Sequence, residues 1–220
     1  MRVKILSLQN RPIVVAHMAK AGTISGTPKP FRRVLRNRLL QAMLELQGVP
    51  HERFRVVSDR IGRPEVQLRE GKKLSVSFSS CRNTEWAALA TKGGMVGIDC
   101  AHPEDFPGTY PFHRVFLPEE LTHVEQLGLE TCHGAAMLWA AKEAVVKALG
   151  CGFHLIAPLD VQITWSSKGI RTVPVAVTFS QRSQERYPNL EHLRVDLIVF
   201  AEYGSWLAVA LHTGDVAPFP

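Results

Sequence analysis

The chain has 220 residues, of which 45% are hydrophobic and 21% charged, as is typical of a soluble globular protein. No apolar run is long enough to cross a bilayer, and charged residues interrupt positions 1–20 before a hydrophobic stretch of signal-peptide length can form. These features exclude a chain that spans a membrane with helices, and they predict a cytoplasmic protein of one or two domains.

The formal net charge is +6, which indicates either an anionic partner or a basic surface without one. Clustering favours a partner, because four arginines lie within seven positions: Arg32, Arg33, Arg36 and Arg38. We do not expect that partner to be a nucleic acid, since we recognise neither a helix-turn-helix nor basic residues interleaved with exposed aromatic ones. The scattered cysteines, Cys81, Cys100, Cys132 and Cys151, have no zinc-like spacing, and disulfides are an alternative that a cytosolic chain of this length does not need.

The first half of the chain predicts strands around one helix. In chain order, we expect strands at residues 3–8 and 13–17, a loop at 22–30, a helix at 31–47, a turn at 62–64, and strands at 74–79, 86–91 and 95–98. Arg32 and Arg36 lie one turn apart on the predicted helix, so both could meet one anion. A solvated basic helix face is the alternative.

The second half predicts two helices followed by strands. We expect a connector at residues 102–118, a short helix from 118, a long helix at 135–149, and strands at 161–165, 173–179, 193–200 and 206–212. Trp86-Ala-Ala-Leu-Ala resembles Trp206-Leu-Ala-Val-Ala, which indicates a duplicated unit. We therefore expect two α+β lobes, residues 1–100 and 101–220.

The long helix carries the sharpest local signal, Trp139-Ala-Ala-Lys-Glu-Ala-Val-Val-Lys147. Glu143 and Lys147 are four residues apart and lie on one face. With Lys142 beside them, a carboxylate between two lysines could hold a metal while the ammonium groups bind phosphate oxygens. An ordinary Glu–Lys pair on a solvated helix is the alternative that the spacing alone favours.

Two weaker signals precede that helix. Asp99 ends the hydrophobic strand Val96-Gly-Ile-Asp99, a common place for a metal ligand but also for a turn residue. The alternating strand around Ser75 and Ser77 presents hydroxyl groups that could contact a phosphate.

In this order, the motifs resemble the surfactin-type 4′-phosphopantetheinyl transferases. That family has a glycine–basic–proline turn, an N/S-x-S-H-S strand, a G-I-D strand end, a W-x-x-K-E-A/S-x-x-K helix and then K-A-x-G-x-G-F. The matching segments are Gly62-Arg63-Pro64, Ser75-Val-Ser-Phe-Ser79, Gly97-Ile-Asp99, Trp139–Lys147 and Lys147-Ala-Leu-Gly-Cys-Gly-Phe153. The likeness spans roughly residues 30 to 212, and its helix motif is the most specific part.

The resemblance implies an α+β fold of two similar lobes related by a pseudo-twofold axis, with the active site at their interface. It also implies Mg²⁺-dependent transfer of the 4′-phosphopantetheine arm of coenzyme A to a serine of an apo acyl, polyketide or peptidyl carrier protein, releasing 3′,5′-ADP. In that mechanism Asp99 and Glu143 coordinate the metal. Glu143 also helps to deprotonate the serine, and Lys142 and Lys147 hold phosphate oxygens.

The remaining implied contacts are with coenzyme A. Arg63 and Pro64 match the turn beside the adenine and ribose, and Ser77 matches a hydroxyl that contacts a phosphate. One of the arginines of the predicted helix, Arg32, Arg33 or Arg36, meets the 3′-phosphate, and the resemblance does not fix which. The family also implies a monomer, and leaves the carrier protein and its pathway open.

Two departures from the family pattern bear on activity. Ala101 stands where many bacterial members have a glutamate that is a third metal ligand; Glu104 or Asp105 could replace it. Phe78 stands where the family has a histidine on the 3′-phosphate, so coenzyme A binds more weakly unless another basic residue takes over. The alternative is therefore a degenerate homologue that binds coenzyme A or a carrier protein without transfer.

Overall fold

The computed structural model describes residues 1–8, 10–19, 29–50, 54–59, 62–165, 175–192 and 195–214. Its first half holds β1 (Arg2–Leu8), β2 (Arg11–Ala19), α1 (Lys29–Glu45), β3 (Phe54–Ser58), β4 (Pro64–Leu68), β5 (Lys73–Cys81), β6 (Thr84–Ala90) and β7 (Met95–Ala101). Its second half holds α2 (Pro118–Gln126), α3 (Thr131–Leu149), β8 (Val161–Trp165), β9 (Val175–Phe179), α4 (Gln181–Arg186), β10 (Val195–Glu202) and β11 (Ser205–His212).

The strands form antiparallel sheets. Six of them pair in the order β1-β2-β6-β5-β4-β3, three in the order β10-β11-β7, and β8 pairs with β9. Gly93 and Gly94 form the glycine turn between β6 and β7, but this turn does not close a hairpin, because β7 pairs with β11 and not with β6. The strand that contains Asp99 continues to Ala101, two residues beyond its expected end, and pairs with β11, whereas the expected first lobe, residues 1–100, includes most of it.

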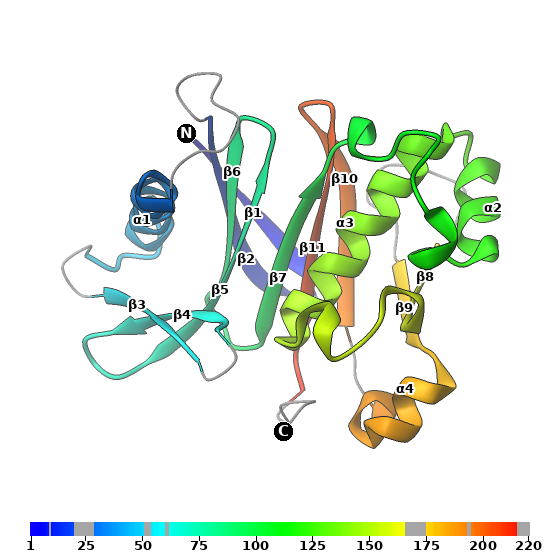
Figure 1. Cartoon of the computed structure of the whole chain (residues 1–220). Helices are drawn as coiled ribbons and strands as arrows, with labels where there is room; N and C mark the ends of the chain where they lie inside the picture. The colour runs from blue at the N-terminus through cyan, green and yellow to red at the C-terminus, as the bar shows by residue number, and fades with distance from the viewer. Residues whose placement is uncertain are drawn as a thin grey trace.

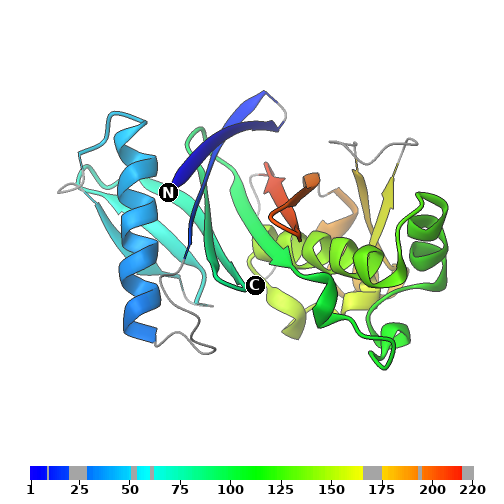
Figure 2. The same cartoon turned by 90° about the horizontal axis from the view of Figure 1, so that it is seen from above.

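The two larger sheets face each other between two helices, in the order α1, six-stranded sheet, three-stranded sheet, α3 (Figures 1 and 2). One hydrophobic core lies between α1 and the first sheet, a second between the two sheets, and a third under α3. Alternation along β6 explains the division, since Ala87 and Leu89 belong to the core beneath α1 while Trp86 and Ala88 belong to the core between the sheets. The expected α+β class is confirmed.

Gly97 sets where α3 crosses β7. A Cβ atom at Gly97 would lie 1.9 Å from the carbonyl oxygen of Ala144 and 2.5 Å from the nitrogen of Ala148. No other residue type permits this approach. The crossing therefore brings the turn of α3 that contains Glu143 and Lys147 onto Asp99, two residues beyond the glycine.

Serine hydroxyl groups join the two sheets along the edge of β7 that faces away from β11. The hydroxyls of Ser75, Ser77 and Ser79 on β5 accept hydrogen bonds from the backbone N–H groups of residues 96, 98 and 100, at 2.9, 3.1 and 3.1 Å. An edge strand at an interface needs partners for its backbone groups, and alternate serines provide them here. The alternating serine strand is thus a structural element as well as a candidate phosphate contact.

Most predicted elements are confirmed within a few residues. Helix α3 begins earlier than predicted because Gly134 does not interrupt it; a Cβ atom there would lie 2.4 Å from the Val124 side chain of α2, so this glycine serves helix packing. Strands β3 and β4 and helix α4 were not predicted. Residues 22–28 of the predicted loop lie outside the described residues, and α1 already begins at Lys29.

Two sequence expectations concern the chain as a whole. All four cysteines are free, so the disulfide alternative is not realised. Among the described residues, no helix has both the length and the apolar character needed to cross a membrane.

Candidate active site

A cleft of about 240 Å³ lies where the first sheet meets the C-terminal end of α3. Its walls come from α1, the segment before β4, β5 and the turn that follows α3. The lining residues are Arg36, Gly62, Arg63, Pro64, Val76, Ser77, Phe78, Lys147, Gly150, Cys151, Gly152 and His154. Five of the predicted binding residues, Arg36, Arg63, Pro64, Ser77 and Lys147, thus line one cleft.

The Lys147 ammonium joins the two predicted metal ligands. Its Nζ lies 2.6 Å from Asp99 Oδ1 and 3.8 Å from Glu143 Oε2, and it also donates to the Ile98 carbonyl oxygen at 3.3 Å. Two acids that are 44 positions apart in the sequence therefore converge on one cation. The structure thus brings the two predicted metal ligands to the same ammonium group.

Desolvation changes the chemistry of Glu143. Burial raises the pKa of its carboxyl group, and the nearby Asp99 raises it further, whereas Lys147 lowers it. Burial is the largest of these influences, so Glu143 accepts a proton more readily than an exposed glutamate. This shift suits a group that takes a proton from an attacking hydroxyl.

The donor set fits a hard divalent cation. Asp99 and Glu143 supply carboxylate oxygens, and the ammonium group between them marks a position where the surrounding charges favour a cation. Ala101 is buried at 4% exposure and offers no oxygen from its side chain. Two protein carboxylates, completed by water and phosphate oxygens, are the usual ligands of Mg²⁺.

The suggested replacements for a third carboxylate face elsewhere. Glu104 and Asp105 pair with Arg82 at 3.0 and 3.3 Å, and Asp105 also accepts a hydrogen bond from the backbone N–H of His102. These contacts hold both acids in the short helical turn after β7. The expectation that one of them replaces the family's glutamate therefore finds no support in the structure.

Lys142 does not join the other predicted site residues. Its side chain is fully buried, and its Nζ lies 2.7 Å from Glu120 Oε2 and donates to the Pro158 carbonyl oxygen at 2.9 Å. Glu120 in turn accepts hydrogen bonds from the backbone of residues 117 and 163, so this ion pair ties α2 and β8 to α3. The structure corrects the predicted phosphate contact, because a side chain one position before Glu143 points about 100° away around the helix.

Two groups of the cleft, the Ser77 hydroxyl and the Arg63 guanidinium, differ in how they could bind an anion. The Ser77 hydroxyl accepts from the Ile98 N–H and still carries a hydrogen that it can donate. Arg63 is paired with Asp59 at 3.2 Å and with Glu65 at 3.5 Å, so its charge is largely balanced within the fold. Pro64 lies beside it at the start of β4.

A basic groove of about 840 Å³ shares the cleft's edge. It is lined by Arg32, Arg33, Arg36, Asn37, Gln41, Phe54, Arg55, Val56, Ser58, Gly62, Pro64 and Phe78. The two cavities have four lining residues in common, Arg36, Gly62, Pro64 and Phe78. The sequence pattern identified the arginines of α1 but missed Arg55, because it did not predict β3.

The turn after α3 also lines the cleft, and the sequence analysis gave its residues no role in the site. Gly150 ends α3 in the left-handed conformation, and Gly152, also at positive φ, follows Cys151. This backbone borders the cleft beside Lys147. The glycine spacing in the family motif that runs from Lys147 to Phe153 was the signal that could have identified it.

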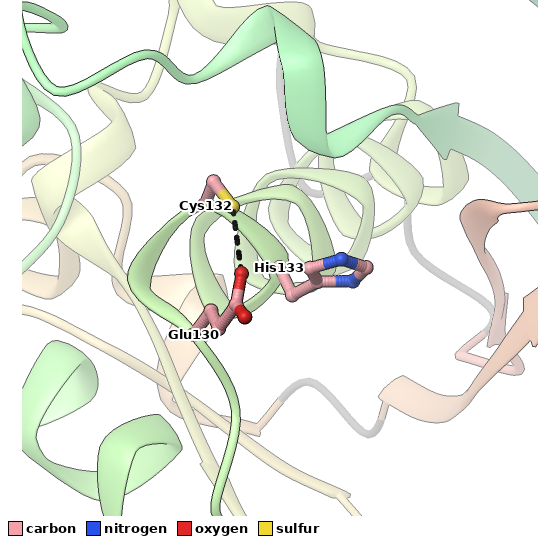
Figure 3. A group of neighbouring side chains, drawn as sticks. All are labelled: Glu130, Cys132 and His133. Atoms are coloured by element: carbon pink, nitrogen blue, oxygen red, sulfur yellow. Dashed lines mark hydrogen bonds between the residues drawn. The ribbon is translucent and has the colours of Figure 1, made fainter.

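Another group of metal-binding side chain types lies at the opposite end of α3. The ligand atoms of Glu130, Cys132 and His133 lie within 4.8 Å of one another, with Cys132 Sγ 4.0 Å from a Glu130 carboxylate oxygen (Figure 3). Ten residues of helix separate Glu143 from His133, about 15 Å along the axis. The positive end of the helix dipole disfavours a cation at this position, so the group forms no part of the candidate site.

Part of the chain is similar to a known protein family. Residues 95–200 match the family model of the 4′-phosphopantetheinyl transferase superfamily. The match contains Asp99, Glu143 and Lys147, and therefore covers both acids and the cation between them. A search of curated proteins gave no match.

Solved structures include similar chains. Holo-[acyl-carrier-protein] synthase of Helicobacter pylori in complex with coenzyme A is 20% identical, covers 54% of this chain and 100% of its own, and has a TM-score of 0.44. The enzyme from Neisseria meningitidis is 22% identical, covers 55% of this chain and 98% of its own, and has a TM-score of 0.46. A Chronobacterium ammoniagenes complex of this synthase with coenzyme A is 22% identical, covers 57% of this chain and 100% of its own, and has a TM-score of 0.45.

Proposed function

We propose that the protein transfers the 4′-phosphopantetheine arm of coenzyme A to a serine of an apo carrier protein. The observation that carries the proposal is the convergence of Asp99 and Glu143 on the Lys147 ammonium beside a cleft with basic walls. The match of residues 95–200 to the transferase superfamily supports it. We further propose a cytoplasmic monomer of the surfactin type.

The site residues have separate tasks in this reaction. Asp99 and Glu143 would hold Mg²⁺, which offsets negative charge on a diphosphate as it reacts. Lys147 would turn its ammonium from the carboxylates to the phosphate oxygens. Arg36, Arg33, Arg63, Pro64 and Ser77 would bind the nucleotide part of coenzyme A.

Glu143 would receive the proton of the carrier's serine, directly or through water. The serine oxygen then forms a bond to the β-phosphorus, the bond from that phosphorus to the bridging oxygen breaks, and 3′,5′-ADP leaves. The raised pKa of Glu143 supports this role because it strengthens the carboxylate as a base.

A transfer assay tests the proposal. The purified protein is incubated with coenzyme A, Mg²⁺ and a panel of apo acyl, polyketide and peptidyl carrier proteins, and the intact carriers are then weighed by mass spectrometry. We expect one phosphopantetheine arm on the serine of at least one carrier, and no transfer when EDTA replaces Mg²⁺. Unmodified carriers throughout the panel would rule out catalysis.

A degenerate homologue is the second candidate, and specific residues favour it. Ala101 offers no third carboxylate, Phe78 replaces a basic side chain, and Lys142 is withdrawn into the core. This candidate predicts that coenzyme A binds, as measured by calorimetry, while every carrier remains unmodified. The retained Asp99–Lys147–Glu143 cluster argues for the active enzyme.

A further inference from the structure

A buried carboxylate lies behind Arg36 on the adjacent strand. Glu85 of β6 is fully buried, and its Oε1 accepts a hydrogen bond from Arg36 Nε at 2.6 Å. The Arg36 side chain is 36% exposed, so the ion pair runs from the core to the surface of the cleft. A buried charge is strongly destabilised without its partner, and Glu85 therefore fixes the orientation of the guanidinium group.

An aromatic ring supports the same guanidinium from another side. The Arg36 Cζ atom lies 4.9 Å from the centroid of the Phe78 ring, within the range of a cation–π contact. Phe78 occupies the position at which the resembling family has a histidine. Where the family has a basic histidine, this chain thus has the Phe78 ring, which contacts the basic side chain of Arg36.

Arg36 and Phe78 both line the cleft beside Lys147 and the basic groove of α1 and β3. We propose that Glu85 and Phe78 are positioning residues that hold Arg36 at this junction as the anchor for the 3′-phosphate of coenzyme A. The inference rests on the proposed function, and it assigns the 3′-phosphate to one arginine of α1. A guanidinium has five N–H donors, so the bond from Nε to Glu85 leaves donors for a phosphate.

Charge and position make opposite predictions for Glu85→Gln. If charge alone governed the site, removing the negative carboxylate would strengthen the binding of a phosphate. If Glu85 positions Arg36, the same substitution weakens binding although the net charge becomes more positive. The sign of the change therefore decides between the two.

Isothermal titration of the full chain with coenzyme A, 3′,5′-ADP and dephospho-coenzyme A measures this sign. For Glu85→Gln we expect the Kd of the first two ligands to rise about tenfold, equivalent to ~1.4 kcal/mol, and the Kd of dephospho-coenzyme A, which lacks the 3′-phosphate, to stay unchanged. In the transfer assay the KM for coenzyme A rises while kcat at saturation is retained. Glu70→Gln, which removes the same charge from an exposed position outside both cavities, serves as the control.

A second variant, Phe78→Leu, is needed because the Glu85→Gln protein could fail to fold after it loses a buried charge. Leucine keeps an apolar side chain but removes the ring, and we expect coenzyme A binding to weaken about fivefold. Equal or tighter binding of coenzyme A by the folded Glu85→Gln variant overturns the inference. An equal loss for dephospho-coenzyme A overturns it as well.

The inference and the proposed function fail in distinguishable ways. If the wild-type protein transfers the arm but Glu85→Gln binds coenzyme A no more weakly, the inference fails and the function stands. If the wild-type protein binds neither coenzyme A nor 3′,5′-ADP, both the proposed function and the assignment of the 3′-phosphate to Arg36 are wrong. The positioning of Arg36 can also be measured without a ligand, from the Nε–H signal of Arg36 in the NMR spectrum, which is assigned by its loss in Arg36→Lys. We expect this hydrogen to exchange slowly with solvent in the wild-type protein and fast in Glu85→Gln. An unchanged exchange rate would contradict the positioning role of Glu85.

Discussion

The hydroxyl group of Ser79 donates a hydrogen bond to Asp99 Oδ1 at 2.8 Å while it accepts one from the backbone N–H of Cys100 at 3.1 Å. The same oxygen of Asp99 contacts Lys147. A residue of the first sheet thus orients a candidate metal ligand of the second. The two sheets must stay in register for this contact to exist.

Ser79→Ala should therefore affect both metal binding and stability. We expect the Mg²⁺ concentration for half-maximal transfer to rise about tenfold to a hundredfold, the usual effect of losing a hydrogen bond to a metal ligand. The unfolding free energy should fall by about 1–3 kcal/mol, because the Cys100 N–H loses its acceptor. Ser75→Ala is the matched control: it removes the acceptor for Val96 but no contact to Asp99, so stability falls while the Mg²⁺ dependence does not change.

Lys142→Met should unfold the protein more easily without disabling the site. Removing one member of the fully buried Lys142–Glu120 pair is expected to lower the unfolding free energy by about 3–5 kcal/mol. Urea denaturation measures the loss, and the KM for coenzyme A of the remaining folded protein should stay at the wild-type value. A wild-type unfolding curve together with abolished transfer would instead place Lys142 in the chemistry.

Lys147→Met should show the opposite pattern. Its side chain is 30% exposed and lies between two carboxylates at the cleft, so we expect transfer to fall about a hundredfold or more. Stability should fall less than in Lys142→Met, because Lys147 is partly exposed, although the buried Asp99 loses an ion pair. The comparison of the two lysine variants by urea denaturation and transfer assay separates the structural lysine from the functional one. Comparable transfer by Lys147→Met and the wild-type protein would remove Lys147 from the mechanism.

Glu143→Gln should lower transfer by about 10²–10⁴-fold and raise stability in metal-free buffer. The folded protein raises the pKa of Glu143, so ionisation of this group opposes folding at a pH above its unfolded value. The stability gain of the variant should be absent at low pH, where both side chains are neutral, and should grow as the pH rises through the raised pKa. Thermal unfolding between acidic and neutral pH in EDTA measures this gain, with exposed Glu125→Gln as the control. A variant less stable than the wild type at neutral pH would contradict the prediction.

Gly97→Ala should separate the candidate metal ligands. The added methyl group would collide with the backbone of α3, so the helix must move away from β7. We expect a loss of roughly 1–3 kcal/mol or more in unfolding free energy, and a further loss of transfer in the folded protein. Gly108→Ala, where a Cβ atom meets nothing within 4 Å, should change neither. Wild-type transfer by Gly97→Ala would show that the approach of α3 is not needed.

Periodicity and turn residues were sufficient to predict the elements that carry the site. A strand that reaches Asp99, and a helix face with Glu143 and Lys147, were predicted from local patterns, and the structure brings these side chains together, although β7 continues to Ala101. The pairing of β7 with β11 could not be predicted in this way. A glycine turn indicates that the chain bends, but it does not specify with which strand the next segment pairs.

Local patterns also failed where a side chain's direction depends on tertiary packing. Lys142 sits one position before Glu143 in the motif, yet α3 is buried on nearly all sides, so even a lysine on it can point into the core. Its partner Glu120 lies on a different helix, and nothing in the spacing of either residue indicates the other. Glu85 was missed for the same reason, since an acid beside Trp86 in a buried strand identifies no partner on α1.

The pairing of β7 with β11 has a consequence for synthesis on the ribosome. The segment that bears Asp99 is made well before β11, its hydrogen-bonded neighbour, which begins only at Ser205. Such a contact between distant parts of the chain forms slowly, and a nascent chain that stops before residue 205 has no β11 for β7 to pair with. The proposed transfer activity should therefore arise only after β11 has been made, so that shorter nascent chains would not consume coenzyme A.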